Sequence, residues 1–187
     1  MKGFRDLALH PSSLSLSADD IVEFHLARIL LLIKICGRKN RIAGLTKFAK
    51  LDFFVRYPDF YLRAKTSLED RQAAHIEKTD KRQSVESSMV RHHYGPWDKR
   101  YYQLLARLSA FGLISVEKSK NTYNIELTEA GAQYAAMLVD DDAFDDLASH
   151  MADVGKTFGG KNGTQLKNLI YQTFEDEVAD RPMGENI

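Results

Sequence analysis

The chain has 187 residues, 44% of them hydrophobic, and its 26 basic side chains balance its 26 acidic ones. This composition suits one medium-sized globular domain with a substantial core. The most apolar run, 29–33, is far too short to span a membrane, the start of the chain lacks the apolar region of a secretory signal, and a lone Cys36 excludes an intramolecular disulfide. We therefore expect a soluble cytoplasmic protein with a buried thiol and no membrane partner.

The zero net charge hides a gradient along the chain. From Lys34 to Lys65 there are nine Lys or Arg and two Asp, whereas from Leu138 to Ile187 eleven Asp or Glu accompany four Lys or Arg. Such halves could offer a basic face to nucleic acid beside an acidic face to protein. Equally, they could neutralise each other within the fold or in a homodimer.

A poorly ordered arm at 1–16 precedes the first predicted helix. Ser17 and Asp20 resemble a capping box, and the helix continues to Cys36, with Gly37 as its stop. Apolar residues cover most of its circumference. The remaining polar strip is narrow and is formed by Glu23, Arg28 and Lys34. We therefore expect this helix to lie at the centre of the domain, buried on more than one side.

A basic loop at 38–41 leads to a second amphipathic helix over 45–57, which Pro58 ends. The spacing of its apolar residues places three cations on the outside, Lys47, Lys50 and Arg56. A short helix over 60–65, an exposed insertion at about 66–84 and a strand over 87–93 follow. The insertion is predicted from its high charge, which does not suit a core element.

The stretch 94–138 predicts the order helix, hairpin, helix. A tight turn at 94–96 starts a helix over 97–111, whose apolar residues are Tyr101, Leu104, Leu105 and Leu108 and whose stop is Gly112. Two β-branched runs, 113–116 and 122–127, are joined by a polar tip, and Thr128 with Glu129 opens a helix to Met137.

We therefore predict a mainly α (α+β) fold: a winged helix-turn-helix domain over 17–139, with a two- or three-stranded wing and additional N- and C-terminal helices. The C-terminal extension, 140–187, contains a helix over 140–154 and a glycine-rich flexible loop over 155–163. Thr164 caps its last helix, which carries four apolar residues on one face, Leu166, Leu169, Ile170 and Phe174.

No pattern indicates an active site, a metal or a cofactor. Gly155, Gly160 and Lys161 match the front of a phosphate-binding loop, but Asn162 replaces the hydroxyl residue that binds magnesium, and no buried strand precedes the loop. His92 and His93 are adjacent and, in a strand, face opposite sides. The aspartates at 140–146 are explained by solvation and by the helix dipole. We therefore expect a binding protein and not an enzyme.

A winged helix suggests DNA as one ligand. The helix over 97–111 would enter the major groove, and cations on the wing and near the second helix would contact phosphates. These candidate nucleic-acid residues are Arg38, Lys39, Arg41, Lys47, Lys50, Lys118 and Lys120. Against this reading, the helix carries Tyr101 and Tyr102 and few side chains that read bases, and winged helices also serve as protein docking modules.

Two stretches resemble a known family. Lys-Leu-Asp-Phe-Phe-Val-Arg-Tyr-Pro at 50–58, and Tyr-Gly-Pro-Trp-Asp at 94–98 leading to Gly-Leu-Ile at 112–114, are similar to the middle component of bacterial ABC-three-component systems, which includes the small subunit of Lamassu anti-phage complexes. The resemblance covers Ser17 to the C-terminus, and departs from the family at 174–176. It implies a non-catalytic winged-helix protein that works between an SMC-like ABC ATPase and an effector, commonly a nuclease, in phage or plasmid defence.

Large side chains beside turns, and charges near them, are the candidates for contacting a partner. They are Arg56, Tyr57, Tyr94, Trp97, Asp98, Arg100 and Arg107. Trp97 and Asp98 also have a structural interpretation, as a packed helix start and as one half of an internal ion pair with Arg56. Our leading hypothesis is an accessory subunit that links the ATPase to its effector, with DNA reached through the assembly. The alternative is a homodimeric DNA-binding transcription regulator.

Overall fold

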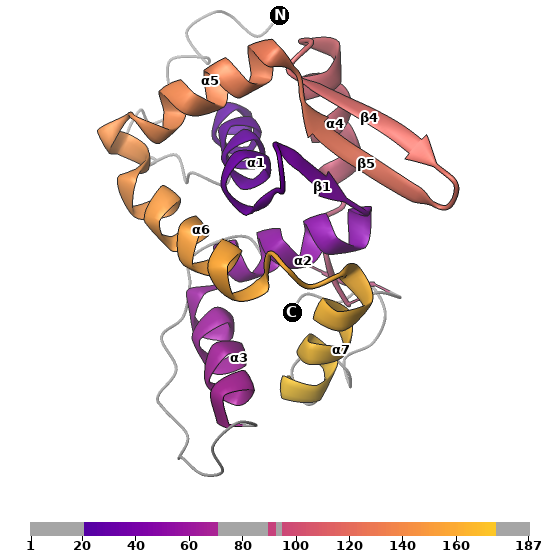
Figure 1. Cartoon of the computed structure of the whole chain (residues 1–187), viewed down its shortest axis with the longest axis vertical. Coiled ribbons are helices and arrows are strands. Elements are labelled where there is room, and N and C mark those ends of the chain that lie inside the picture. Colours follow the sequence, from indigo (N-terminus) through magenta and orange to yellow (C-terminus); the bar gives the residue numbers. More distant parts are fainter. Residues whose placement is uncertain (1–20, 71–89, 93–94, 175–187) are drawn as a thin grey trace, which may run out of the picture.

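Seven α-helices and two small antiparallel sheets make up the part of the chain that the computed structural model describes, residues 21–70, 90–92 and 95–174 (Figure 1). This confirms the mainly α, α+β prediction. The N-terminal arm, the Ser17 capping box, Tyr94 and the last 13 residues lie outside the described residues, as does most of the predicted insertion. None of the helices within the described ranges is long and apolar enough to cross a membrane.

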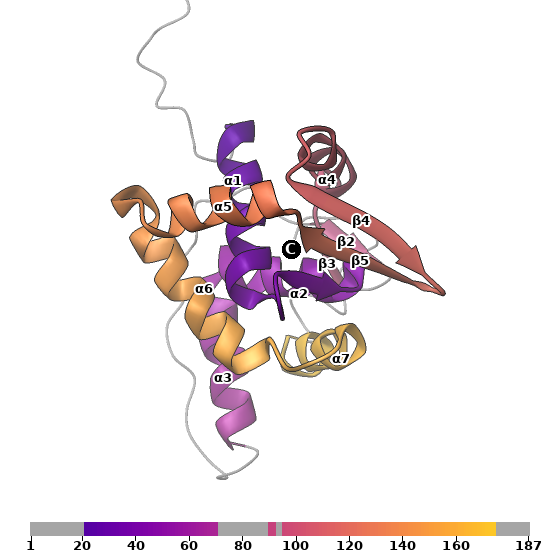
Figure 2. The ribbon, with the colours of Figure 1, turned by 45° about the horizontal axis from the view of Figure 1, so that its top comes forward.

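The first helix, α1 (Val22–Cys36), lies at the centre, as predicted. Its residues 28–33 are all buried, because α5 and α6 pack against it from different sides (Figure 2). Arg28, one of the three residues of the predicted polar strip, is only 1% exposed, so this part of the strip is buried as well. Gly37 ends the helix as expected, in an extended conformation, and a larger residue would not fit there because its Cβ would lie 2.1 Å from the carbonyl oxygen of Ile33.

The second helix, α2 (Leu45–Arg56), is buried along most of its length. It packs against α6, α7 and α3 as well as α1, and every residue from Phe48 to Arg56 is buried. The prediction that Lys50 and Arg56 lie on an outer face is therefore wrong, because no face of this part of the helix is free. Lys47, one turn earlier, is half-buried.

Pro58 both ends α2 and begins α3 (Pro58–Asp70), a position where its missing N–H costs nothing. This helix is longer than the predicted 60–65. The next described elements are β2 (Val90–His92) and β3 (Gly95–Trp97), which pair antiparallel with His92 opposite Gly95. Gly95 and Pro96 thus belong to a strand, and the predicted tight turn at these two residues is wrong.

The helix and hairpin predicted from the change in periodicity are both present. They are α4 (Tyr101–Ala110), β4 (Ile114–Ser119) and β5 (Thr122–Leu127). A third strand, β1 (Arg41–Ala43), pairs with β5, so that the sheet has the antiparallel order β1-β5-β4. The β4–β5 hairpin projects to one side of the molecule (Figure 1).

Helix α5 (Glu129–Val139) begins where predicted, because the Thr128 side chain accepts a hydrogen bond from the backbone N–H of Gly131. A 3-10 turn, η3 (Asp142–Phe144), leads to α6 (Asp145–Phe158).

The predicted flexible loop is wrong in its first half, since Gly155 to Phe158 are helical. The last helix, α7 (Gly163–Thr173), is capped by Asn162 and Gln165 in a capping box and not by Thr164. Its predicted apolar face is buried, including Phe174 just beyond the helix. Helices α6 and α7 thereby share the core of α1 and α2.

Candidate functional site

A buried carboxylate, Asp52 of α2, joins three helices. Arg28 of α1 donates to both of its oxygens, from Nε to Oδ1 at 2.9 Å and from Nη2 to Oδ2 at 3.2 Å. The Tyr101 hydroxyl of α4 donates to Oδ2 at 2.7 Å. All three side chains are at most 1% exposed. A buried charge is tolerated only when paired and hydrogen-bonded, so this cluster fixes the positions of α1, α2 and α4 relative to one another.

A second carboxylate, Asp98, holds the start of α4. Arg56 donates from Nη1 to Oδ2 at 2.9 Å, and Arg100 donates from Nη2 to the same oxygen at 2.8 Å. The backbone N–H of Arg100 also donates to Oδ1 at 2.8 Å. The internal Arg56–Asp98 ion pair considered from the sequence is thereby confirmed. It ties α2 to the segment between β3 and α4.

His25 of α1 connects the two clusters. Its Nδ1 lies 2.8 Å from Nη1 of Arg28, and its Nε2 lies 3.0 Å from Nη1 of Arg100. A neutral imidazole accepts at one nitrogen only, so the two guanidinium groups compete for a single acceptor site. The result is one continuous polar network that extends from Asp52 to Asp98.

Burial and neighbouring charges shift the acidity of several of these groups. Burial alone raises the pKa of Asp98, but hydrogen bonds from Arg100 and the charge of Arg56 outweigh it and lower the pKa to about 2. Burial, reinforced by Asp52, raises the pKa of Tyr101 well above its ordinary value. Burial, and then the charge of Lys167, lower the pKa of Lys50 to about 7. These groups hold elements together, and within the described ranges no cluster of His, Cys, Asp and Glu could bind a metal ion.

The structure places most of the predicted partner-binding residues inside the molecule. Arg56, Tyr57, Trp97 and Asp98 are at most 8% exposed. The side chain of Arg100 is 33% exposed but is engaged by Asp98. The exception is Arg107, which lies on the exposed face of α4. Tyr94 lies outside the described residues.

The predicted nucleic-acid residues fall into two separate exposed groups. Arg38, Lys39 and Arg41 form a turn beside the base of β5, where the Leu127 N–H donates to the Asn40 carbonyl. The other group is at the hairpin tip and consists of Lys118 and Lys120.

Two further lysines do not belong to either group. Lys47 donates from its Nζ to the carbonyl of Gly159. Lys50 is fully buried, and its Nζ donates to the carbonyl of Pro96 at 2.7 Å. The prediction of a solvent-facing Lys50 is therefore wrong.

The glycine-rich segment after 154 does not form a phosphate-binding loop. Helix α6 runs through Gly155, so the absence of a preceding strand that was inferred from the sequence is confirmed. A Cβ at Gly155 would lie 3.3 Å from the carbonyl oxygen of Ile35. This glycine therefore serves the close approach of α6 to α1.

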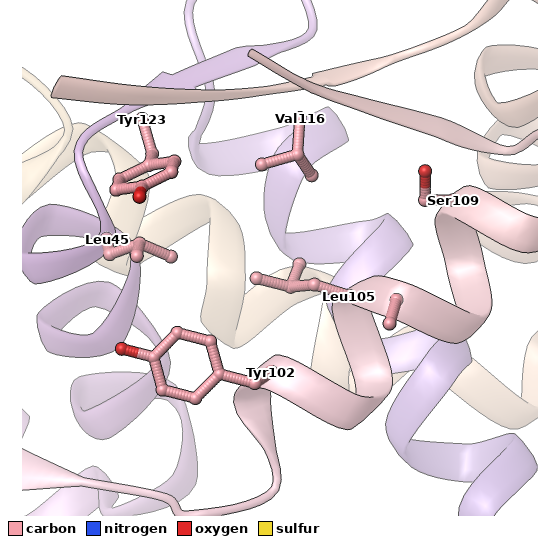
Figure 3. Close-up of a pocket in the computed structure, with 7 residues that line it drawn as sticks. Leu45, Tyr102, Leu105, Ser109, Val116 and Tyr123 are labelled. Atoms are coloured by element: carbon pink, nitrogen blue, oxygen red, sulfur yellow. The ribbon is translucent and has the colours of Figure 1, made fainter. Parts of the chain in front are cut away.

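A groove of about 350 Å³ lies between α4 and the hairpin. Val116 and Tyr123 point from β4 and β5 toward Leu105 and Tyr102 of α4, with Leu45 at the start of α2 closing one side (Figure 3). Ala106 and Ser109 complete the lining. Tyr102 is 62% exposed, Tyr123 40% and Val116 38%. Three large hydrophobic side chains are thus both exposed and gathered at one place.

Sequence reasoning did not identify this groove. Tyr102, Ala106 and Ser109 lie three or four residues apart and form a second, mostly apolar face of α4. That spacing was a usable signal, but it was concealed by the stronger stripe of buried residues on the same helix. The sequence likewise predicts Val116 and Tyr123 only as residues of two strands. That their side chains share one face of the hairpin follows from the strand register, which pairs Val116 with Ile125 and Tyr123 with Lys118.

Comparisons of the chain with family models, with curated proteins and with solved structures find no match.

Proposed function

We propose that this chain is a non-catalytic winged-helix docking subunit that joins an SMC-like ABC ATPase to an effector, commonly a nuclease, in a cytoplasmic defence complex against phages or plasmids. The resemblance to the middle component of ABC-three-component systems motivates the assignment. The observation that carries the docking role is the exposed face of α4, which is apolar and bordered by a groove. Such a surface suits contact with another protein.

The order of elements supports the winged-helix part of the proposal. A helix, a strand and a helix (α1, β1, α2) precede α4, which is followed directly by the β4–β5 hairpin, and β1 joins the hairpin in one sheet. In winged helices the helix before the hairpin and the hairpin itself form the binding surface. Here α3 and the β2–β3 pair are inserted between α2 and α4.

The side chains of α4 favour protein over DNA as the ligand of this surface. Its exposed residues are Tyr102, Gln103, Ala106, Arg107, Ser109 and Ala110. Sequence-specific readout of the major groove relies on several Arg, Lys, Asn or Gln side chains that reach base edges. Arg107 and Gln103 are the two of these types exposed on α4, whereas Tyr102 offers a large apolar contact area.

The buried network gives the remaining partner candidates a supporting role. Arg56, Asp98 and Arg100 hold the start of α4 and do not offer free charges to a partner. Their contribution to docking would be the rigid placement of Tyr102 and Arg107. A preorganised surface binds more tightly because less freedom is lost on association.

The test is to express the tagged chain together with the genes that flank its own, and to determine the mass and composition of what co-purifies. A coiled-coil ATPase recovered in fixed ratio is the expected result, and Arg107→Glu should weaken that recovery while the chain stays folded. Recovery of the chain alone would contradict the proposal.

The alternative, a homodimeric DNA-binding regulator, is favoured by the two exposed basic groups at 38–41 and at the hairpin tip. It predicts that the isolated chain is a dimer and binds a specific duplex with nanomolar affinity and a steep dependence on salt. A docking subunit alone should bind DNA weakly and without sequence preference. Light scattering and binding titrations at several salt concentrations separate the two.

A further inference from the structure

The groove between α4 and the hairpin has an apolar interior. Leu45, Leu105, Ala106 and Val116 contribute aliphatic surface, and Tyr102 and Tyr123 contribute two aromatic rings. A dry cavity of about 150 Å³ accepts a benzene ring. A groove of about 350 Å³ therefore has room for one or two large apolar side chains of a ligand.

The charge beside this interior is positive and comes from the hairpin. Strand pairing places Lys118 opposite Tyr123, on the face of the hairpin that looks toward α4, and the Lys118 ammonium lies 5.7 Å from the centre of the Tyr123 ring. Glu117 and Glu126 alternate to the opposite face of the sheet. Helix α4 carries no carboxylate, and its one charged residue, Arg107, does not line the groove. A ligand in the groove thus meets the Lys118 ammonium and no carboxylate from these two elements.

Hydroxyl groups add hydrogen-bond donors to the groove. The lining includes Tyr102, Ser109 and Tyr123, and the two tyrosines border the groove from opposite elements (Figure 3). A carboxylate beside an apolar anchor could accept from a tyrosine O–H and lie near the Lys118 ammonium. Hydrogen bonds to ionised groups are about twice as strong as those between neutral groups.

We propose that this groove binds a short acidic segment of a partner protein, in which one or two large apolar side chains are flanked by Asp or Glu. This inference rests on the docking function proposed above and names the chemistry of its ligand. DNA fits less well, because a single lysine beside an apolar interior falls far short of the roughly six to ten phosphate contacts of a DNA-binding protein whose affinity depends steeply on salt. Charge and apolar shape together select the acidic segment.

The test is a selection of random dodecapeptides displayed on phage against the full chain, with counter-selection on the Tyr102→Ser, Val116→Asp double variant. Enriched peptides should combine Leu, Phe, Trp or Met with several Asp or Glu. Synthetic versions, measured by fluorescence polarisation, should bind the double variant at least about tenfold more weakly. Lys118→Glu should weaken binding severalfold, and raised salt should do so as well.

Matched controls separate a groove effect from a general one. Tyr134 of α5 is 56% exposed, close to the 62% of Tyr102, and it does not line the groove. Tyr134→Ser should therefore leave peptide affinity unchanged, and Lys156→Glu on α6 is the corresponding control for Lys118. Circular dichroism and thermal unfolding should show that every variant is folded.

Three results would overturn the inference. They are the failure to enrich any peptide, enrichment of basic or uncharged polar peptides, and equal binding to the double variant. A 20-base-pair duplex that displaces the peptides and is lost in the same variants would reassign the groove to nucleic acid. If the ATPase co-purifies although no acidic peptide binds, this inference fails and the docking function stands. If acidic peptides bind the groove but no ATPase co-purifies, the groove's ligand chemistry stands and the proposed docking to an ATPase fails.

Discussion

Helices α2 and α4 look alike in the sequence, since each is a dozen residues or fewer and combines an apolar stripe with basic residues, three in α2 and one in α4. In the structure they differ completely. Residues 48–56 of α2 are buried on every side, with Lys50, Asp52 and Arg56 inside, whereas α4 buries a single stripe and exposes Tyr102 and Arg107. The more highly charged helix, α2, is therefore interior, whereas α4 lies at the surface with an aromatic side chain exposed.

The comparison teaches that charge on a helix does not by itself indicate exposure. What decides is how many other elements pack against it: α2 is surrounded by α1, α3, α6 and α7, while β4 is the main partner of α4. Each buried charge of α2 then needs a partner within the fold. Asp52 has Arg28 and Tyr101, Arg56 has Asp98, and Lys50 has the Pro96 carbonyl.

Removing the central carboxylate of α2 is the strongest way to test this difference. Asp52→Ala leaves the Arg28 guanidinium buried without its main partner, so we expect the free energy of unfolding to fall by about 3–5 kcal/mol. Urea unfolding at pH 7 measures it. The control Asp153→Ala, at an exposed position of α6, should change stability by no more than about 0.5 kcal/mol. A loss below about 1 kcal/mol for Asp52→Ala would mean that water reaches this face of α2.

A second test uses the pH dependence of Lys50. Its pKa is about 7 in the fold and 10.5 without burial, so the unfolded chain binds more protons between these values. Stability should therefore rise from pH 7 to pH 9, by about 1–2 kcal/mol, and Lys50→Met should lack this rise. Urea unfolding at pH 7, 8 and 9 measures it, with Lys156→Met as an exposed control.

The measurement stops at pH 9 because, at higher pH, ionisation of Cys36 in the unfolded chain lowers the stability of the fold. Burial, with a smaller effect of Asp52, raises its pKa to about 12, so above pH 9 the unfolded chain loses a proton that the folded chain keeps. Equal pH slopes for the wild type and Lys50→Met between pH 7 and 9 would show that Lys50 is hydrated.

The smallest effect on stability is expected on α4. Arg107→Glu changes an exposed side chain, so unfolding should shift by no more than about 0.5 kcal/mol, as measured by thermal and urea unfolding. Arg100→Glu differs, because it places a second carboxylate against Asp98 and should destabilise the chain clearly. A large loss for Arg107→Glu would contradict the assignment of this face as free surface.

Much of the fold could be predicted from periodicity and caps. Thr128, Gly37 and the alternation over 114–127 located α5, the end of α1 and the hairpin, because these signals act within a few residues. The turn at Gly95 and Pro96 was mispredicted, since their strand pairing with 90–92 is not a local property of Gly and Pro. The candidate site was harder still: the groove exists only because α2, α4 and the hairpin converge, and no short motif encodes that convergence.

The central position of α1 has a consequence for the order of events during synthesis. Its apolar run at 29–33 leaves the ribosome before α5 and α6, which cover it, and the Cys36 thiol donates to the Met151 carbonyl, 115 residues later. At about 5–20 residues per second, α1 waits roughly 5 to 20 seconds for these helices. During this interval the nascent chain displays the apolar run 29–33 without the two helices that bury it in the fold.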